Sequence, residues 1–400
     1  MTSSVDEHLA ALYRLRRFGI KFGLDTITRL LRGLENPQNR FPSIHVAGTN
    51  GKGSIAAFLS SILDRGGYKV GLYTSPHLIR FNERIQINGR PIPNNDLAQV
   101  LEAVQGIYTQ GEPPTFFECA TAMALYYFAV KKVDWAVVET GMGGRYDATN
   151  VVEPEVSIIS NISMEHQVYL GNTLAEIARE KAGIIKQGAG VVTGVRQKTP
   201  LEVIEAVAKQ KGAPLYRLGK EIRIRKVTDE AFTYFGINHN WPRVGISLMG
   251  DHQRTNAALA LGAAELLQEK GLHLPDEAIY EGLEGTSWPG RLEIVSKQPF
   301  VLLDGAHNPS AMRKLRKFLE NSDVFRRLIM VVGILEDKGW KSMLRELSAV
   351  SDRMIITKPH YERAADPYEL ASFARFLKQE PLVIPNLPDA ISRALEEAGP

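Results

Sequence analysis

A glycine-rich turn holds the residues with the clearest chemical potential in this sequence: Gly48-Thr49-Asn50-Gly51-Lys52-Gly53-Ser54. An apolar run before it, Ser43–Gly48, predicts a buried strand, and Lys52–Arg65 has apolar residues at helical spacing. Glycines let backbone N–H groups surround phosphate oxygens, and the helix N-terminus adds a favourable dipole. We therefore expect Lys52 to reach the β- and γ-phosphates of a nucleotide and Ser54 to lie where Mg²⁺ is held.

The turn departs from the usual phosphate-loop pattern, G-x-x-x-x-G-K-[ST], at two positions. Val46 occupies the first glycine position, and Gly53 separates Lys52 from the serine. The alternative reading is a plain β-turn with a surface lysine. The order strand, loop, helix argues against that alternative.

Other predicted strands end in polar side chains of the kind that bind cations. Ser75 ends one strand, and Glu139 ends another just before a run of glycines. Because ligands of open α/β sheets gather at the carboxyl edge, we expect Glu139 to hold a hard cation such as Mg²⁺ near the phosphate turn. His166 follows a third strand, and Lys181 lies one helix further on. In isolation, the stretch Arg179-Glu180-Lys181 is typical of a solvated helix face.

Short apolar runs alternate with helical patterns along most of the chain. This order indicates an α/β fold with a mostly parallel sheet and helices on both faces. The strands expected in it are Ser43–Gly48, Val70–Ser75, Trp135–Thr140, Val156–Ser160 and Gly190–Gly194. After Lys211 the pattern changes, and three runs resemble β-hairpins beside the main sheet: Leu215–Arg225, Ala231–Ile237 and Val244–Met249.

A run of structure breakers, Gly285–Gly290, predicts a linker between two domains. We expect a P-loop ATP-binding domain over residues 1–286 and a smaller Rossmann-like α/β domain over residues 287–400. The strands of the second domain are expected at Phe300–Leu303, Leu328–Gly333, Arg353–Thr357 and Leu382–Ile384. Asp304 and His307 follow the first of these strands and Arg291 follows the linker, and we expect them to face the first domain across a cleft.

Composition narrows the class of protein. The 400 residues are 44% hydrophobic, and 48 Lys plus Arg against 45 Asp plus Glu leave a net charge of +3. That charge is too small to argue for nucleic acid on its own, and no apolar run approaches the roughly 18 residues of a membrane span. One cysteine, Cys119, excludes a disulfide framework. We expect a cytoplasmic monomer with no nucleic-acid or membrane partner.

Eight motifs stand in the order found in folylpolyglutamate synthases and bacterial dihydrofolate synthases, which belong to the Mur ligase superfamily. They are GTNGKGS (48–54), TSPHL (74–78), ERI (83–85), ETGMGGRYDATN (139–150), EKAGIIK (180–186), HQRTNA (252–257), WPGRLE (288–293) and DGAHNP (304–309). The sequence resembles this family over nearly its whole length. The resemblance implies ATP-dependent amide formation, in which a pteroate or folate carboxylate becomes an acyl phosphate. The amine of L-glutamate then attacks, and ADP and phosphate leave.

Position by position, the resemblance also implies roles for single residues. The phosphate-binding residues are Asn50, Gly51, Lys52, Gly53 and Ser54. Two Mg²⁺ ions are implied, the first on Ser75 and Glu139 and the second on Glu139, His166 and a carbamylated Lys181. Lys52, His166 and Lys181 are the implied catalytic residues. Further nucleotide contacts fall on Asn256, Arg291, Asp304 and His307. The residues near the pterin-bearing substrate are Thr115, Phe117, Asp147 and Ala148.

Two features depart from the family pattern. Glu165 stands where the family usually has Asp before the metal-ligand histidine. The usual final strand with its Thr-Gly-Ser signature has no counterpart after Leu395, so we expect the second domain to lack that strand. The alternatives are a peptidoglycan Mur ligase with a UDP-linked substrate, a nucleotide-dependent switch protein and an inactive homologue. The choice between dihydropteroate and folate as acceptor stays open.

Overall fold

The structure is a computed structural model that describes residues 5–19, 21, 23–108, 113–322 and 325–399. The chain separates into two units, Met1–Trp288 and Pro289–Pro400. The boundary predicted after residue 286 falls two residues before this division.

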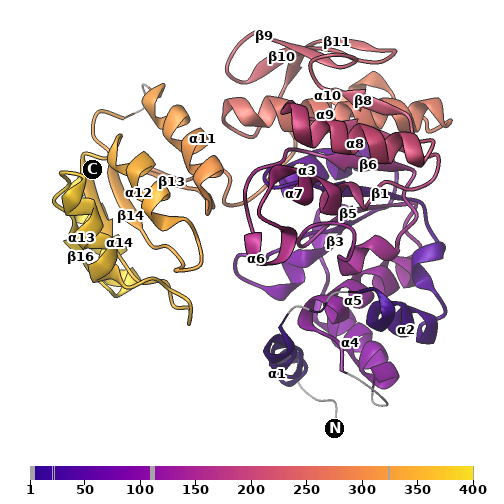
Figure 1. The fold of residues 1–400 in the computed structure, drawn as a ribbon, viewed down its shortest axis with the longest axis horizontal. Coiled ribbons are helices and arrows are strands. Elements are labelled where there is room, and N and C mark those ends of the chain that lie inside the picture. Colours follow the sequence, from indigo (N-terminus) through magenta and orange to yellow (C-terminus); the bar gives the residue numbers. More distant parts are fainter. Residues whose placement is uncertain (1–4, 20, 22, 109–112, 323–324, 400) are drawn as a thin grey trace. The chain divides into compact units, whose positions relative to one another are not determined.

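An eight-stranded sheet forms the centre of the first unit, in the order β4-β3-β2-β5-β1-β6-β7-β8 (Figure 1). The six strands from β2 to β8 in this order are parallel, and β3 and β4 extend the sheet antiparallel at one edge. The bounds are β1 Ser43–Ala47, β2 Val70–Tyr73, β3 Ile85–Ile87, β4 Arg90–Pro91, β5 Trp135–Glu139, β6 Val156–Ile159, β7 Gly190–Thr193 and β8 Leu215–Arg217. The predicted mostly parallel sheet is confirmed.

Helices cover both faces of this sheet (Figure 1). Successive strand residues point to opposite faces, so Val137 packs with helices α3 and α9 while Ala136 and Val138 pack with α5 on the other side. The helix bounds are α1 Val5–Arg14, α2 Asp25–Gly33, α3 Lys52–Arg65, α4 Asn94–Tyr108, α5 Phe116–Lys131, α6 Gln167–Leu170, α7 Leu174–Ala182, α8 Lys198–Gln210, α9 Asp251–Glu269 and α10 Asp276–Glu284. Helix α3 begins at Lys52 and ends at Arg65, as the apolar spacing predicts.

Two strand predictions after Lys211 are wrong in part. The run Leu215–Arg225 was expected to form a hairpin beside the sheet, but its first three residues are β8, which pairs parallel with β7. The physical reason is helix α8, which returns the chain to the same edge in the crossover that parallel pairing requires. The predicted strand Val244–Met249 is displaced as well, because β11 spans Asn240–Gly245.

A three-stranded antiparallel sheet lies outside the main one, in the order β11-β10-β9. Its other strands are β9 Arg223–Lys226 and β10 Ala231–Phe235. Glu265, a fully buried carboxylate on α9, fastens this sheet to the core. It accepts hydrogen bonds from the Tyr234 hydroxyl (2.6 Å) and from the backbone N–H groups of Ile237, Asn238 and His239 (2.9, 3.0 and 2.7 Å). One side chain therefore fixes the whole β10–β11 turn.

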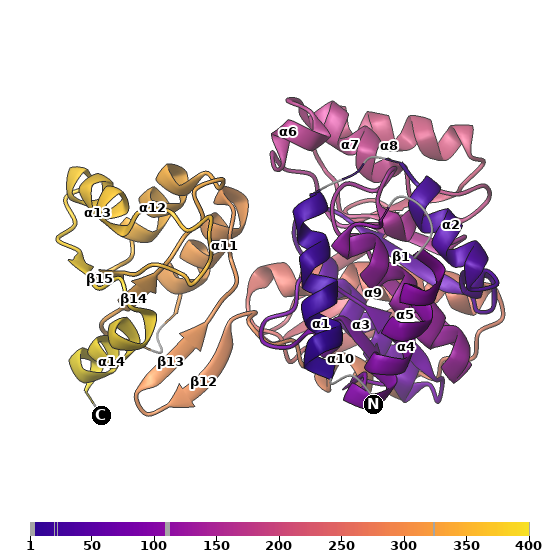
Figure 2. The same ribbon diagram turned by 90° about the horizontal axis from the view of Figure 1, so that it is seen from below.

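The second unit contains a parallel sheet with the strand order β14-β15-β16. It also contains an antiparallel ribbon of β12 and β13, and Figure 2 shows this ribbon. The bounds are β12 Glu293–Lys297, β13 Phe300–Leu303, α11 Pro309–Glu320, β14 Ile329–Val332, α12 Trp340–Ser348, β15 Arg353–Ile356, α13 Pro367–Phe376, β16 Leu382–Val383 and α14 Leu387–Ala398. The four expected strands are present, each followed by a helix. The sequence reading missed β12, the strand that pairs with β13.

Candidate functional site

The glycine-rich turn leaves β1 and enters α3 with little free space around it. Gly48 has a φ of +145°, and a Cβ there would lie 1.8 Å from the Ser160 hydroxyl oxygen. A Cβ on Gly51, which caps the helix with a φ of +86°, would lie 2.4 Å from Oδ1 of Asn256 on α9. Only glycine fits these two positions. The side chain of Asn256 thus lies directly against the loop.

Lys52 folds back over the loop that it follows. Its Nζ donates hydrogen bonds to the carbonyl oxygens of Gly48 (3.1 Å) and Thr49 (3.4 Å). The ammonium therefore lies above the loop near the first turn of α3, where the helix dipole also favours an anion. The Lys52 ammonium and the dipole of α3 therefore both favour an anion at the phosphate loop.

Glu139 and Ser75 meet at the carboxyl edge of the sheet. Glu139 lies opposite Val46 of the neighbouring β1, and its Oε2 accepts a hydrogen bond from the backbone N–H of Ser75 at 3.0 Å. Both follow from the strand order, because β5 lies between β1 and β2. The predicted metal-ligand pair is thus brought together beside the phosphate loop.

Two hydroxyl groups in this region are buried and carry no internal hydrogen bond among the described residues: Ser54 Oγ and Thr140 Oγ1. Ser54 lies in the first turn of α3, and Thr140 follows Glu139. Buried polar atoms normally have a partner. Hydroxyl and carboxylate oxygens are ligands that Mg²⁺ prefers, and a hydroxyl group can also donate a hydrogen bond to phosphate, so the chemistry of this edge fits a magnesium nucleotide.

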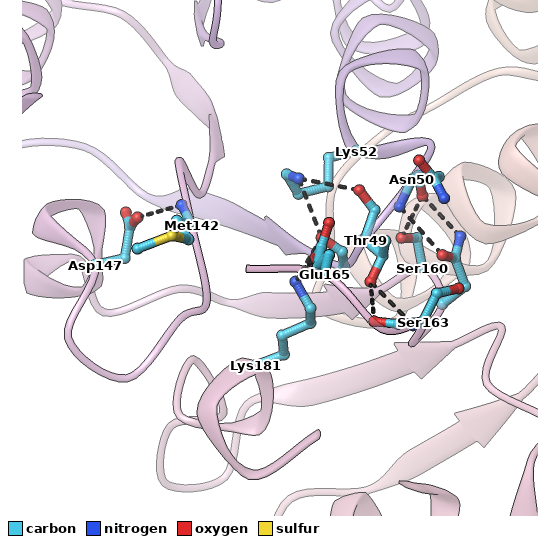
Figure 3. A network of polar contacts seen from close by, with 11 residues as sticks. Thr49, Asn50, Lys52, Met142, Asp147, Ser160, Ser163, Glu165 and Lys181 are labelled. Carbon is cyan, nitrogen blue, oxygen red and sulfur yellow. Dashed lines mark hydrogen bonds and ion pairs between the residues drawn. The ribbon is translucent and has the colours of Figure 1, made fainter. Parts of the chain in front are cut away.

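Lys181 is buried, with 1% of its surface exposed, so it does not lie on the solvated helix face that its stretch suggests in isolation, whereas Arg179 is exposed. Its Nζ donates to Glu165 Oε1 (2.7 Å), as Figure 3 shows, and it also donates to the Gly48 carbonyl (2.9 Å). Burial lowers the pKa of Lys181 to about 8, although the Glu165 carboxylate opposes that shift. Burial by itself raises the pKa of Glu165, but the charges of Lys181 and Lys52 outweigh it and hold that pKa below its ordinary value.

His166 is exposed and adopts a left-handed conformation, with a φ of +45°, at the start of α6. In the described part of the chain, no group of three or more histidine, cysteine or acidic side chains is close enough to hold a metal ion. Glu139 and His166 are therefore not assembled into such a group. Glu165, the residue that differs from the family pattern, is the one that contacts Lys181.

The residues expected near the acceptor surround the loop after β5. Phe117 packs on Gly141, where a Cβ would lie 2.5 Å from the ring. Thr115 caps α5 and accepts a hydrogen bond from the Glu118 N–H at 3.2 Å. Asp147 is buried and accepts from the Met142 N–H at 2.8 Å, and burial raises the pKa of its carboxyl group. Ala148 follows it and is buried too.

Sequence reasoning missed two residues behind Asp147. The Thr149 hydroxyl donates to Asp147 Oδ1 at 2.5 Å, and His45 Nε2 lies 2.8 Å from the same hydroxyl oxygen. The single hydroxyl proton of Thr149 is used in the hydrogen bond to Asp147. The Thr149 oxygen can therefore only accept from His45, so His45 donates from Nε2. His45 stands in the middle of the β1 run, where a histidine gives no signal beyond a core position.

The pH dependence of stability should report on His45. Burial, with a smaller contribution from Lys186, lowers the pKa of His45 to about 3. Between the unfolded pKa of about 6.5 and that value only the unfolded chain takes up the proton, so stability falls as the pH falls, by up to about 1.4 kcal/mol per pH unit. A His45→Gln variant keeps a donor to Thr149 but does not titrate. Denaturant titrations of both proteins at pH 7 and 5 should therefore show a smaller loss for the variant, and equal losses would contradict this account.

A second group lies beside Phe116, the neighbour of Thr115 and Phe117, and it joins His77 and Arg84 of two quoted motifs to Tyr13, which sequence reasoning missed. The Phe116 ring stacks on Tyr13 with centroids 5.7 Å apart, and the guanidinium of Arg84 lies 5.2 Å from its centroid. Arg84 is buried, and its Nε donates to His77 Nδ1 at 2.8 Å. Burial, followed by the charge of Arg84, lowers the pKa of His77 to about 4. This end of the first unit is aromatic and positively charged.

In the second unit, the three predicted residues also come together. A Cβ on Gly305 would lie 2.5 Å from Nη1 of Arg291, so the guanidinium rests on the loop after β13. Asp304 accepts from the N–H groups of Leu292 (3.1 Å) and Ala306 (2.9 Å), and burial raises the pKa of its carboxyl group. His307 is exposed, with its Nδ1 2.9 Å from the Gly305 carbonyl oxygen.

None of the helices in the described residues is long and apolar enough to cross a bilayer.

The fold and this site place the chain among the Mur ligases. The Mur ligase middle domain matches residues 46–264, and the Mur ligase glutamate ligase domain matches residues 290–400. A Bacillus subtilis protein named dihydrofolate synthase/folylpolyglutamate synthase is 41% identical over 362 residues, which cover 87% of this chain and 84% of that protein.

Two solved structures are similar over almost the whole chain. Escherichia coli FolC in complex with DHPP and ADP has a TM-score of 0.91 at 31% identity, and the match covers 99% of this chain and 92% of that one. Mycobacterium tuberculosis folylpolyglutamate synthase complexed with ADP has a TM-score of 0.91 at 34% identity, with 98% and 92% covered. The chain belongs to the folylpolyglutamate synthase/dihydrofolate synthase family of Mur ligases.

Proposed function

We propose that this chain is an ATP-dependent ligase that adds L-glutamate to dihydropteroate, to the glutamate tail of a reduced folate, or to both. The reaction passes through an acyl phosphate on the acceptor carboxylate, and it releases ADP and phosphate. A carboxylate is a poor electrophile, so phosphorylation provides the leaving group that the amine displaces. The enzyme then has to position the reactants and neutralise charge.

The observation that supports this most strongly is the juxtaposition of Glu139 and Ser75 at the sheet edge beside the phosphate loop. ATP bound there supplies the phosphoryl group, and Mg²⁺ neutralises its oxygens. Lys52, the loop N–H groups from Gly51 to Ser54 and Asn256 hold the phosphates and the nucleotide in this proposal, and Asn50, whose own N–H is bonded to Asn161, shapes the loop. Ser75 and Glu139 hold the first Mg²⁺, and the Ser54 hydroxyl, which is buried and has no hydrogen-bond partner among the described residues, can bind the same ligands.

A second Mg²⁺ is proposed on Glu139, His166 and a carbamylated Lys181. Burial of Lys181 supports this, because it favours the neutral amine that takes up CO₂. A carbamate is an anionic oxygen ligand of the kind Mg²⁺ prefers. The ion pair with Glu165 must open for this chemistry. We further propose that Thr115, Phe117, Asp147 and Ala148 bind the acceptor and that Arg291, Asp304 and His307 contribute to the nucleotide site.

Asp304 offers a test of the second unit. In Asp304→Ala the rate of ADP release with pteroate and glutamate should fall by at least about 100-fold, or about 3 kcal/mol of transition-state stabilisation, because the loop that carries His307 loses its charged anchor. Asp337→Ala is the matched control, since Asp337 forms only an exposed ion pair with Arg363 in the same unit. Unchanged turnover in Asp304→Ala would remove the second unit from the proposed mechanism.

The experiment that tests the function itself is an ADP-release assay with glutamate and one acceptor at a time. Dihydropteroate and a reduced folate should each be compared with a UDP-linked peptidoglycan precursor. ADP release that requires glutamate and a pterin-bearing acceptor supports the proposal, and the ratio of the first two rates assigns the preferred acceptor. ADP release only with the UDP-linked compound, or with no acceptor at all, would overturn it.

A further inference from the structure

We propose that Asn161 is a positioning residue for the nucleotide: its side-chain amide clamps the backbone of Asn50 and so fixes the phosphate loop for the anion. The inference rests on the proposed ATP site, and it concerns a residue outside the phosphate loop and outside the implied metal ligands. Asn161 lies two residues after the end of β6, in the segment that leads to His166.

One amide group satisfies both backbone groups of one residue. The Asn50 N–H donates to Asn161 Oδ1 at 3.1 Å, and Asn161 Nδ2 donates to the Asn50 carbonyl oxygen at 2.7 Å. The Ser160 hydroxyl donates to the same carbonyl oxygen, also at 2.7 Å. Figure 3 shows Asn50 and Ser160 next to each other. A neighbouring β-strand would pair with the N–H and the carbonyl of Asn50 in the same way, but here the Asn161 side chain makes both hydrogen bonds.

The direction of the Asn50 carbonyl matters for anion binding. A loop binds phosphate through its N–H groups, and a carbonyl oxygen that faced the phosphate would repel it. Two donors at 2.7 Å hold the Asn50 carbonyl toward the β6 segment. Preorganised donors cost no rearrangement when the ligand arrives, so the clamp should appear directly in nucleotide affinity.

The same segment makes further bonds to the loop. The Thr49 N–H donates to the Asn161 carbonyl oxygen at 2.9 Å, and the Ser163 N–H donates to the Thr49 hydroxyl at 3.1 Å. Two residues beyond Ser163, Glu165 pairs with Lys181, which itself donates to the Gly48 carbonyl. Three consecutive loop residues are thus hydrogen-bonded to the segment or to its ion-pair partner. The clamp therefore also fixes the position of the segment that leads from Asn161 to His166 relative to the phosphate loop.

The test measures MgADP affinity by calorimetry, with no acceptor present, in the full-length protein. Asn161→Ala removes both clamp bonds and should weaken MgADP binding about tenfold or more, since single hydrogen bonds of this kind correspond to roughly threefold to tenfold. Ser160→Ala removes one of two donors and should weaken it about threefold. The double variant should lose more than the product of the two, because the Asn50 carbonyl then has neither donor.

Gln197→Ala is the matched control. The Gln197 amide donates to the Ile162 carbonyl at 2.8 Å, in the same segment, but it does not contact the phosphate loop. Its MgADP affinity should stay within twofold of the original protein, and its melting temperature should fall about as much as that of Asn161→Ala. In the ATP-dependent reaction, Asn161→Ala should raise the KM for ATP by about the same factor as the MgADP dissociation constant, with the KM for the acceptor changed less than twofold.

Several outcomes would overturn the clamp. These are MgADP affinity within twofold of the original in Asn161→Ala, an equal loss in Gln197→Ala, and strictly multiplicative effects in the double variant. If Asn161→Ala does not fold, Ser160→Ala alone decides, because unchanged affinity there contradicts the role of the Asn50 carbonyl. The proposed function fails separately: if no pterin-bearing acceptor supports ADP release but Asn161→Ala still loses MgADP affinity, the clamp stands and the acceptor assignment falls.

Discussion

ADP release with pteroate and glutamate should fall by at least about 1,000-fold when Lys52 is replaced by alanine. The variant removes the positive charge that lies over the phosphate loop, and such a charged contact contributes about 4 kcal/mol or more in the transition state. The fold should survive, because the hydrogen bonds of Lys52 Nζ to the described residues go to two carbonyl oxygens of its own loop. Steady-state ADP release and a thermal melt measure the two effects.

Lys209→Ala provides the control for Lys52. Lys209 is an exposed lysine in the last turn of α8, so its loss changes the net charge equally and should leave turnover unchanged. If Lys52→Ala kept near-normal turnover while MgADP still bound, the phosphate-loop assignment would be wrong.

Replacing Lys181 by alanine should abolish synthesis, with a loss of more than about 1,000-fold, and bicarbonate or a short carboxylic acid should restore part of it. The reason is that a carboxylate in the space left by the buried side chain can replace the proposed carbamate as an oxygen ligand. Lys181→Arg separates this role from a simple ionic one. It keeps a cation beside Glu165 but cannot be carbamylated, so it should be as inactive as Lys181→Ala.

Lys186→Ala is the matched control for Lys181, because it lies in the same motif with a half-buried ammonium bonded to the Asn150 carbonyl. It should keep most of the activity. A ¹³C spectrum recorded with labelled bicarbonate should show a carbamate signal that Lys181→Ala lacks. Normal turnover in Lys181→Arg, or the same signal in Lys181→Ala, would rule out the carbamate.

The main sheet could be predicted because most of its strands are short, mostly apolar and separated by helices. The run Ser43–Ala47, a glycine turn and a helix from Lys52 leave few alternatives, and both elements form as expected. Leu215–Arg217 and Glu293–Lys297 could not be assigned in the same way. The first has only three half-buried residues and takes its place from α8, and the second carries charged residues at both ends.

The site was predictable in its residue types but not in its contacts. Glu139 and Ser75 follow strands, and the sheet order brings them together, which the parallel edge predicts. The burial of Lys181 depends on how α7 packs against the sheet, and sequence neighbours such as Arg179 and Glu180 conceal it. Asn161 and His45 act through single atoms on partners more than 100 residues away, a relation that no local pattern records.

Helix α9 connects two parts of the first unit that lie far apart in the sequence, the phosphate loop and the β10–β11 turn. Asn256 touches Gly51 near its start, and Glu265, nine residues or about 13 Å further along the axis, holds the β10–β11 turn. Buried apolar residues run along the whole of this helix and belong to one core cluster. The outlying antiparallel sheet therefore shares a cooperative folding unit with the phosphate loop. A fragment that stopped before Glu265 would lose the sheet and, with it, the support beneath Gly51.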